Sequence, residues 1–245
     1  FRLYDRALSA TEIDTLYKAT RAPTDTGLVA HWKLDETSGT TAADAVGSED
    51  GTLVNMDGST DWVTGVQGNG AVFDGAAEYI TLTDLSGSGI DYSQDFSLST
   101  WVKLVQFDEP SSNCSDDRAI IFAHENTANN RGVALMTQPA NSNRIRFTHG
   151  FTDTTAVNAT HPGSLLTDQW YHVVGTYDAS AEEQQVFVNG ILGGTGSSAG
   201  KTAYNPDGIA HIGGVTKNCG ADYLNGVVDD FRIYDRELTQ TEIET

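Results

Sequence analysis

The stretch Gly226-Val-Val-Asp-Asp-Phe-Arg-Ile-Tyr-Asp-Arg-Glu-Leu-Thr-Gln-Thr-Glu-Ile-Glu-Thr245 decides the fold of this chain. Its first half alternates with a two-residue period and is rich in β-branched and aromatic residues, which predicts a β-strand. Strict alternation would put Asp229 and Asp230 on opposite faces of that strand. The second half differs in character: Thr239, followed three residues later by Glu242, forms a capping box and predicts a short helix.

The same strand-and-helix unit opens the chain. Residues 1–15 align with residues 231–245 at a constant offset, with ten identities in fifteen positions. We therefore expect residues 1–26 to be the end of a preceding repeat, with a short helix of its own, plus a linker. Residues 27–245 are then one complete domain, since nothing within them is typical of a linker.

Composition narrows the possible partners of the chain. It carries 34 acidic and 14 basic residues, a net charge of −20, which argues against nucleic acid and against anionic membrane surfaces. No apolar run approaches the ~20 residues of a membrane span. Cys114 and Cys219 both lie in polar, loop-like surroundings, so we expect a disulfide between them and an oxidising compartment.

The remainder of the chain reads as about a dozen short strands separated by Gly, Asp and Ser turns, with almost no helix. Asn189-Gly190 is a strong signal for a tight hairpin. This pattern predicts an all-β protein with a two-sheet sandwich architecture.

Several motifs follow one another in an order that resembles the laminin-G-like, concanavalin A-like jelly roll of bacterial proteins. They are Gly27-Leu-Val-Ala-His-Trp-Lys-Leu-Asp-Glu, Gly70-Ala-Val-Phe-Asp-Gly, Phe96-Ser-Leu-Ser-Thr-Trp-Val, Gln169-Trp-Tyr-His-Val-Val-Gly-Thr-Tyr-Asp, Val186-Phe-Val-Asn-Gly, His211-Ile-Gly-Gly and the Gly226 stretch. The resemblance implies two curved antiparallel sheets, a non-catalytic role in a large secreted or cell-surface protein, frequent glycan binding and frequent structural calcium. It does not fix a ligand.

For calcium, the resemblance points to the last strand and to the amino-terminal acidic loop. By that analogy Asp230 is the first candidate ligand, with Asp44 and Asp50 as weaker ones, because calcium takes oxygen ligands from such loops. The alternative is that these aspartates only form turns and caps.

Catalysis is not expected of this domain. Glycosidases of this fold need a pair of carboxylates facing one cleft, and no strand between residues 27 and 245 carries the required Glu-x-Asp-x-x-Glu spacing.

For ligand binding, sugar sites combine aromatic platforms with planar polar side chains. We interpret Trp32, Trp101 and Trp170 mainly as core, because they fall within the strand motifs of the family. In Arg144-Ile-Arg-Phe-Thr-His149 the alternation puts Arg144, Arg146 and Thr148 on one face. The expected ligand-binding residues are His124, Asn126, Arg131, Arg146, His149 and Tyr223, and the arginines suggest an anionic sugar.

These observations predict a non-catalytic glycan-binding module of a secreted or cell-surface protein, stabilised by calcium and flanked by neighbouring repeats. The alternative is a structural or adhesive spacer repeat of a bacterial adhesin, without a sugar site of its own.

Overall fold

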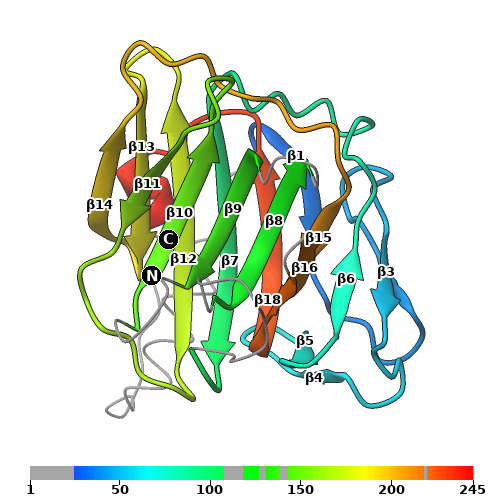
Figure 1. The fold of residues 1–245 in the computed structure, drawn as a ribbon. Coiled ribbons are helices and arrows are strands. Elements are labelled where there is room, and N and C mark those ends of the chain that lie inside the picture. Colours follow the sequence, from blue (N-terminus) through cyan, green and yellow to red (C-terminus); the bar gives the residue numbers. More distant parts are fainter. Residues whose placement is uncertain (1–24, 108–117, 127–130, 138–142, 218–219, 245) are drawn as a thin grey trace, which may run out of the picture.

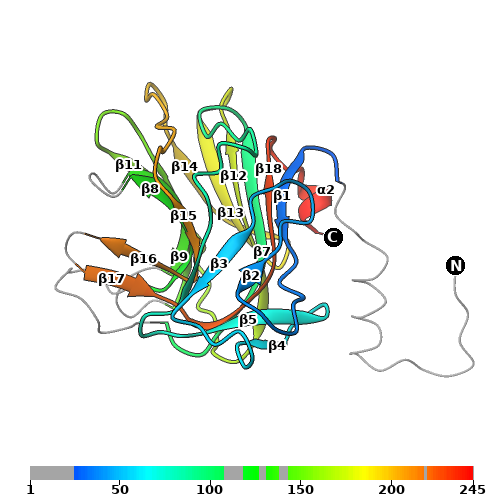
Figure 2. The same cartoon turned by 90° about the vertical axis from the view of Figure 1, so that its right-hand side faces the viewer.

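The computed structural model describes residues 25–107, 118–126, 131–137, 143–217 and 220–244. It is a sandwich of two antiparallel sheets that face each other across a single main core (Figures 1 and 2). The all-β jelly-roll prediction is confirmed. The predicted amino-terminal repeat and its predicted helix, and both cysteines, fall on residues outside the described ones, so the repeat and the disulfide stay predictions.

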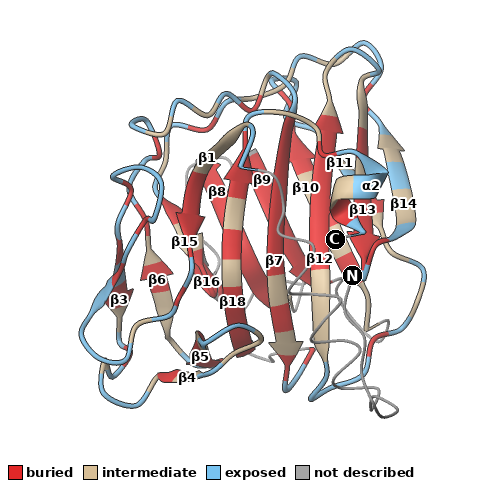
Figure 3. Cartoon of the chain, turned by 180° about the vertical axis from the view of Figure 1, so that it is seen from behind, coloured by how far each residue is buried: buried red, intermediate tan, exposed pale blue. Residues whose placement is uncertain are grey.

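The first sheet has eight strands and is seen from its outer side in Figure 3. In spatial order its strands are β14 (Ile191–Ser197), β13 (Glu183–Val188), β12 (Trp170–Asp178), β7 (Phe96–Leu104), β18 (Asn225–Tyr234), β5 (Asn69–Asp74) and β4 (Trp62–Thr64), with β1 (Leu28–Trp32) also paired to β18.

The second sheet also has eight strands, and a separate hairpin accompanies it. Its spatial order is β11 (Ala156–Thr160), β10 (Ile145–Gly150), β9 (Arg131–Thr137), β8 (Ile120–Asn126), β15 (Ala210–Ile212), β6 (Tyr79–Thr81), β3 (Gly51–Val54) and β2 (Thr41–Ala42); the hairpin is β16 (Gly214–Lys217) with β17 (Gly220–Tyr223).

The core consists of the inward-facing side chains of both sheets. Its largest fully buried members include Trp32, Phe73, Phe96, Phe122, Phe147 and Phe231. The predicted alternation in β10 is confirmed, because Ile145, Phe147 and His149 are fully buried whereas Arg144, Arg146 and Thr148 are only partly so. Burying an aromatic or aliphatic side chain of this kind stabilises the fold by roughly 1.5–3 kcal/mol each.

A short helix, α2 (Gln240–Ile243), covers one part of the outer face of the first sheet (Figure 3). The predicted capping box is present: the Thr239 hydroxyl accepts from the Glu242 amide, and the Glu242 carboxylate accepts from the Thr239 amide. Leu238 and Ile243 form a second apolar cluster with side chains of β12, β13 and β18. The helix therefore shields only this end of the outer face.

At the β14 edge, the two sheets approach each other closely. Asn189 and Gly190 both have positive φ angles, as the predicted tight turn between β13 and β14 requires. Further along β14, a Cβ on Gly194 would lie 2.3 Å from the Thr160 carbonyl oxygen, and one on Gly196 would lie 2.8 Å from the Asn158 oxygen. Only glycine allows the backbone of β14 to contact β11 in this way.

Two of the predicted ligand-binding residues belong to the interior. His149 is 0 % exposed and its ring packs against those of Phe96, Phe151 and Tyr177, the last at 4.5 Å between ring centroids. His124 is 2 % exposed and its Nε2 lies 2.9 Å from the Gly208 carbonyl oxygen. Burial lowers the pKa of each imidazole to about 4. The prediction that they contact a ligand at the surface is wrong, because both point inward.

We predict that His149 makes the fold acid-sensitive. Its pKa is about 4 when folded and 6.5 when unfolded, so the unfolded chain alone takes up a proton between these values. The free energy of unfolding is therefore unaffected by His149 above pH 6.5. As the pH drops toward 4, protonation of His149 in the unfolded chain lowers it by on the order of 3 kcal/mol. His149→Phe should reduce the difference between urea unfolding free energies at pH 7 and pH 5.

The matched control is His161→Phe, at a partly exposed histidine outside the core clusters. It should leave the pH dependence of the free energy of unfolding unchanged. An identical slope for wild type and His149→Phe would contradict the assignment.

Candidate functional site

The central strand β18 contains a β-bulge at Asp229 and Asp230. Asp229 is opposite Trp101 and Arg232 is opposite Ser99, so β18 has one more residue here than β7. Asp230 takes a left-handed φ of 54°. The prediction that the two aspartates lie on opposite faces is therefore wrong, since the extra residue shifts the alternation.

The bulge coincides with a change of neighbour along β18. Residues 225–228 pair with β5, whereas residues 231–234 pair with β1. At the bulge, the Thr100 hydroxyl of β7 donates a hydrogen bond to the backbone carbonyl of Asp229 at 3.0 Å. Between the ends of β5 and β1, the side chains of the bulge are left uncovered by a neighbouring strand.

A cavity of about 630 Å³ occupies this position on the outer face of the first sheet. Asp229, Asp230 and Arg232 contribute from β18, His31 and Leu28 from β1, and Gln67 from the turn between β4 and β5. Asp25, Lys33, Asp35, Ala45 and Val46 complete the wall. The volume is that of a typical small-ligand pocket.

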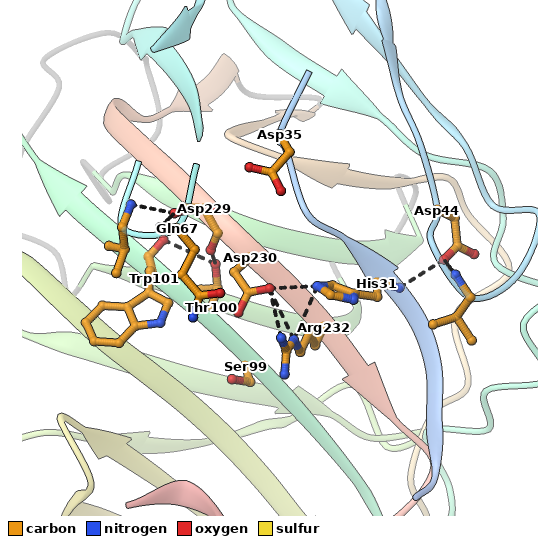
Figure 4. A network of polar contacts seen from close by, with 12 residues as sticks. His31, Asp35, Asp44, Gln67, Ser99, Thr100, Trp101, Asp229, Asp230 and Arg232 are labelled. Carbon is orange, nitrogen blue, oxygen red and sulfur yellow. Dashed lines mark hydrogen bonds and ion pairs between the residues drawn. The ribbon is translucent and has the colours of Figure 1, made fainter. Parts of the chain in front are cut away.

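Asp229 is the most unusual group in this cavity (Figure 4). Its Oδ2 accepts hydrogen bonds from the Val66 and Gln67 amides, at 2.6 and 3.0 Å, and so fixes the β4–β5 turn. The side chain is 0 % exposed, and its Oδ1 has no hydrogen-bond partner within the described protein. Burial, with the nearby Asp230 and Asp35 carboxylates, raises the pKa of Asp229 to about 7 against the opposing effect of the two amides.

Asp230 has the opposite environment. Its Oδ1 lies 2.6 Å from Nε2 of His31 and 3.1 Å from a terminal nitrogen of Arg232 (Figure 4). Burial alone would raise the pKa of Asp230, but these two partners outweigh it and the pKa is lowered. Asp230 is thus an ionised, partly buried carboxylate in contact with Arg232 and His31.

Asp44 and Asp50 organise the loop between β2 and β3. Asp44 accepts from the His31, Val46 and Glu49 amides, and Asp50 accepts from the Asp44 amide at 2.8 Å. Burial raises the pKa of Asp44, yet these amide donors outweigh it, so the pKa is below its usual range. Asp44 therefore holds the loop that forms one wall of the cavity.

The three predicted calcium ligands do not converge on one point in this structure. Asp230 faces a guanidinium and an imidazole, while the Asp44 oxygens accept from backbone amides. Among the described residues, no group of three or more His, Cys, Asp or Glu side chains is placed to hold a metal ion. These donors do not fit calcium as they stand, and calcium stays a prediction.

An aromatic group lies next to the cavity on the same outer face. The Trp101 ring is 5.2 Å from the His172 ring, and Trp101 lies beside Asp229 and Gln67 in Figure 4. On the next pair of positions, the Lys103 ammonium is 5.3 Å from the Trp170 ring. Trp32 is core as predicted, but Trp101 and Trp170 are only partly buried and lie outside the core clusters, so their interpretation as core is wrong.

The sequence of β7 indicates that Trp101 lies on the outer face of the first sheet. In β7, Ser97, Ser99, Trp101 and Lys103 alternate with Phe96, Leu98, Thr100 and Val102. A tryptophan at a position shared with serines and a lysine indicates the polar face of a strand, not the core. The bulge itself has no comparable signal in a single sequence.

The other predicted ligand-binding residues lie on strands of the opposite sheet or of the β16–β17 hairpin, and Arg146 and Tyr223 are not among the residues that line the cavity. Arg146 is partly buried on β10, and Tyr223 on β17 stacks on Tyr79 with 6.2 Å between ring centroids. Asn126 and Arg131 are paired across β8 and β9, but their side chains lie outside the described part of the structure. With His124 and His149 in the interior, the predicted set forms no single surface site.

Comparison with protein-family models gives a match over residues 73–244, to the family described as the concanavalin A-like lectin/glucanases superfamily. The chain belongs to this superfamily. Its laminin-G-like motifs thus agree with both the sheet topology and the family model. A search of curated proteins gives no match.

Solved structures with this superfamily fold include domain 4 of AbnA, a GH43 extracellular arabinanase from Geobacillus stearothermophilus, in complex with arabinotriose. It has a TM-score of 0.64 and 21 % identity, over 89 % of this chain and 96 % of that domain. A mutant Trypanosoma rangeli sialidase with trans-sialidase activity has a TM-score of 0.63 and 18 % identity, over 91 % of this chain and 33 % of the sialidase. The botulinum neurotoxin serotype G binding domain has a TM-score of 0.64 and 17 % identity, over 89 % of this chain and 50 % of the toxin domain.

At these identities the likeness establishes the shared fold and nothing finer. The superfamily domain corresponds to nearly all of the arabinanase domain, but only to a third of the sialidase chain and half of the toxin domain. In the described part of the chain, no helix is long and apolar enough to cross a membrane.

We predict that the bulge depends on the Thr100 hydroxyl. Thr100→Val keeps the shape of the side chain but removes the hydrogen bond to the Asp229 carbonyl, at a site where Thr100 is fully buried. A buried carbonyl without its donor costs about 1–3 kcal/mol, measured as a loss in the free energy of urea unfolding.

Thr81→Val on β6 is the control, since its hydroxyl is partly exposed and makes only a 3.4 Å contact. Equal losses for the two variants would show that the bulge carbonyl does not need Thr100.

Proposed function

We propose that the chain is a non-catalytic glycan-binding module, and that glycans bind at the cavity around Asp229. The observation that carries this proposal is the joint placement of the cavity and the partly buried Trp101–His172 pair on one outer face. Protein-bound sugars are typically held by aromatic faces together with a few placed polar groups. The cavity supplies both acceptors, such as Asp229, and donors, such as Lys33 and Gln67.

The rigid setting of these groups supports the proposal. Asp229, Arg232 and Trp101 stand on strands at the centre of a sheet, and the Gln67 turn is held by Asp229. A site whose side chains are fixed before binding loses little conformational entropy when a ligand enters.

The comparisons favour the same class of ligand. The arabinanase domain of this fold is in complex with arabinotriose. Because the identity is 21 %, the particular sugar does not transfer, but a neutral oligosaccharide is a suitable first probe. An extracellular arabinanase as a structural neighbour also supports a secreted or cell-surface location.

The proposed module binds without turnover. Its buried carboxylate Asp229 accepts from backbone amides, and Asp230 is paired with Arg232 and hydrogen-bonded to His31, so neither is arranged as the acid or nucleophile of a glycosidase pair. The alternative function, an adhesive spacer without a sugar site, is the reading that a negative binding result would favour.

We predict that Ala45→Tyr abolishes glycan binding. Ala45 is exposed and lines the cavity, so a tyrosine there should fill the entrance without disturbing the core. Isothermal titration with arabinotriose and with glycans selected on an array should show at least a tenfold loss. Trp101→Ala should weaken the same binding by a similar factor, because it removes the aromatic contact.

The control is Ile209→Tyr, at an exposed residue just before β15 of the opposite sheet. It should bind as wild type does. Unchanged binding in both Ala45→Tyr and Trp101→Ala would place the glycan elsewhere, whereas silence of wild type across the array would favour the spacer.

Calcium is proposed separately, on the resemblance alone. If an ion stabilises the domain through Asp230, a chelator should lower the melting temperature, and Asp230→Ala should remove that response. An unchanged melting temperature in chelator would end the calcium proposal and leave the glycan proposal intact.

A further inference from the structure

We infer that the cavity selects neutral sugars and rejects acidic ones, with Oδ1 of Asp229 as the acceptor for a sugar hydroxyl. This inference rests on the proposed function and names its ligand class. It also replaces the anionic sugar expected from the arginines of β10. Those arginines are on the other sheet and do not line the cavity.

The first argument is the charge balance of the cavity. Its wall holds four aspartates, Asp25, Asp35, Asp229 and Asp230, against the two cations Lys33 and Arg232 and the imidazole of His31. Arg232 and His31 both contact Asp230. Even with Asp229 counted as neutral, two carboxylates then face one ammonium group, in a chain of net charge −20.

That balance disfavours an anionic ligand. A uronate brings an acceptor-only carboxylate into a partly enclosed space that already has an excess of the same charge, and like charges in such a space repel strongly. A neutral sugar brings hydroxyl groups, which both donate and accept. It can pair with the aspartates as a donor and with Lys33 or Gln67 as an acceptor.

The second argument is the unpaired oxygen. Oδ1 of Asp229 is buried and has no hydrogen-bond partner among the described residues, although the other oxygen of the same carboxylate holds two amides. A buried polar atom without a partner costs about 1–3 kcal/mol, and a bound water, ion or ligand is one way to satisfy it. Because Asp229 is one of the residues that line the cavity, we infer that a ligand in the cavity supplies the missing donor.

The third argument is that the unpaired oxygen of Asp229 requires a hydrogen-bond donor and not an acceptor. The backbone amides of Val66 and Gln67 are donors beside this carboxylate, but both already donate to Oδ2 of Asp229 and leave Oδ1 without a partner within the described protein. Of the cavity's charged donors, Arg232 pairs with Asp230. A ligand hydroxyl therefore fits this oxygen, and a ligand carboxylate does not.

The test uses Asp229→Asn. The asparagine oxygen can keep the two turn amides, while its NH₂ group replaces Oδ1 and presents a donor to the cavity in place of an acceptor. Wild type should bind neutral arabinan, galactan or glucan fragments and not polygalacturonate or alginate fragments on a glycan array. In Asp229→Asn, titration with the best neutral fragment should show about tenfold or greater weakening, as expected for the loss of one hydrogen bond.

Asp84→Asn is the matched control, because it removes one exposed aspartate charge beyond β6 on the opposite sheet. It should leave neutral-sugar affinity within about threefold of wild type. Thermal melting establishes that each variant is folded, and the array result with wild type stands even if Asp229→Asn does not fold.

The outcomes separate this inference from the proposed function. Preferential binding of acidic fragments, lost in Ala45→Tyr, would overturn the inference while the glycan-binding function stands. Neutral binding that is unchanged in folded Asp229→Asn would overturn the role of its oxygen. No binding by wild type to any fragment would overturn the proposed function and the inference together.

Discussion

The hydrogen-bond ladder of β18 is the constraint on which the site depends. Its pairing with β7 is interrupted only at the bulge, but its other side is shared between β5 and β1. The bulge at Asp229 and Asp230 falls at the transfer from one neighbour to the other, and Thr100 supplies a donor to the Asp229 carbonyl there. That one extra residue produces the cavity, lets Asp229 hold the β4–β5 turn, and places Asp230 beside Arg232.

Much of the fold could be predicted from the sequence, because its signals are local. The capping box at Thr239, the turn at Asn189 and the alternation in β10 each depend on neighbouring residues, and all three are present. The site could not be predicted in the same way. Strict alternation failed at Asp230, and the cavity joins β1, the 65–68 turn and β18, which are far apart in the chain.

An aromatic ring beside polar side chains is a sound criterion for a sugar site, but the residues predicted by it do not lie at the cavity. The sequence predicts binding groups on β8 and β10, but His124 and His149 on these strands fill the interior. The same combination occurs on β7 and β12, as Trp101 and His172 beside Asp229. Deciding between the two required knowing which face of each strand meets the other sheet, and histidine suits either environment.

The close contact of β14 with β11 has a consequence for how molecules of this protein meet one another. β14 is the terminal strand of its sheet and exposes Ile191 and Leu192, features that usually invite edge-to-edge pairing and aggregation. Its glycines instead admit the backbone of β11, which closes this side of the sandwich. A bulkier residue at Gly194 or Gly196 would push β14 away from β11 and leave this edge of the sheet more exposed to pairing with another molecule.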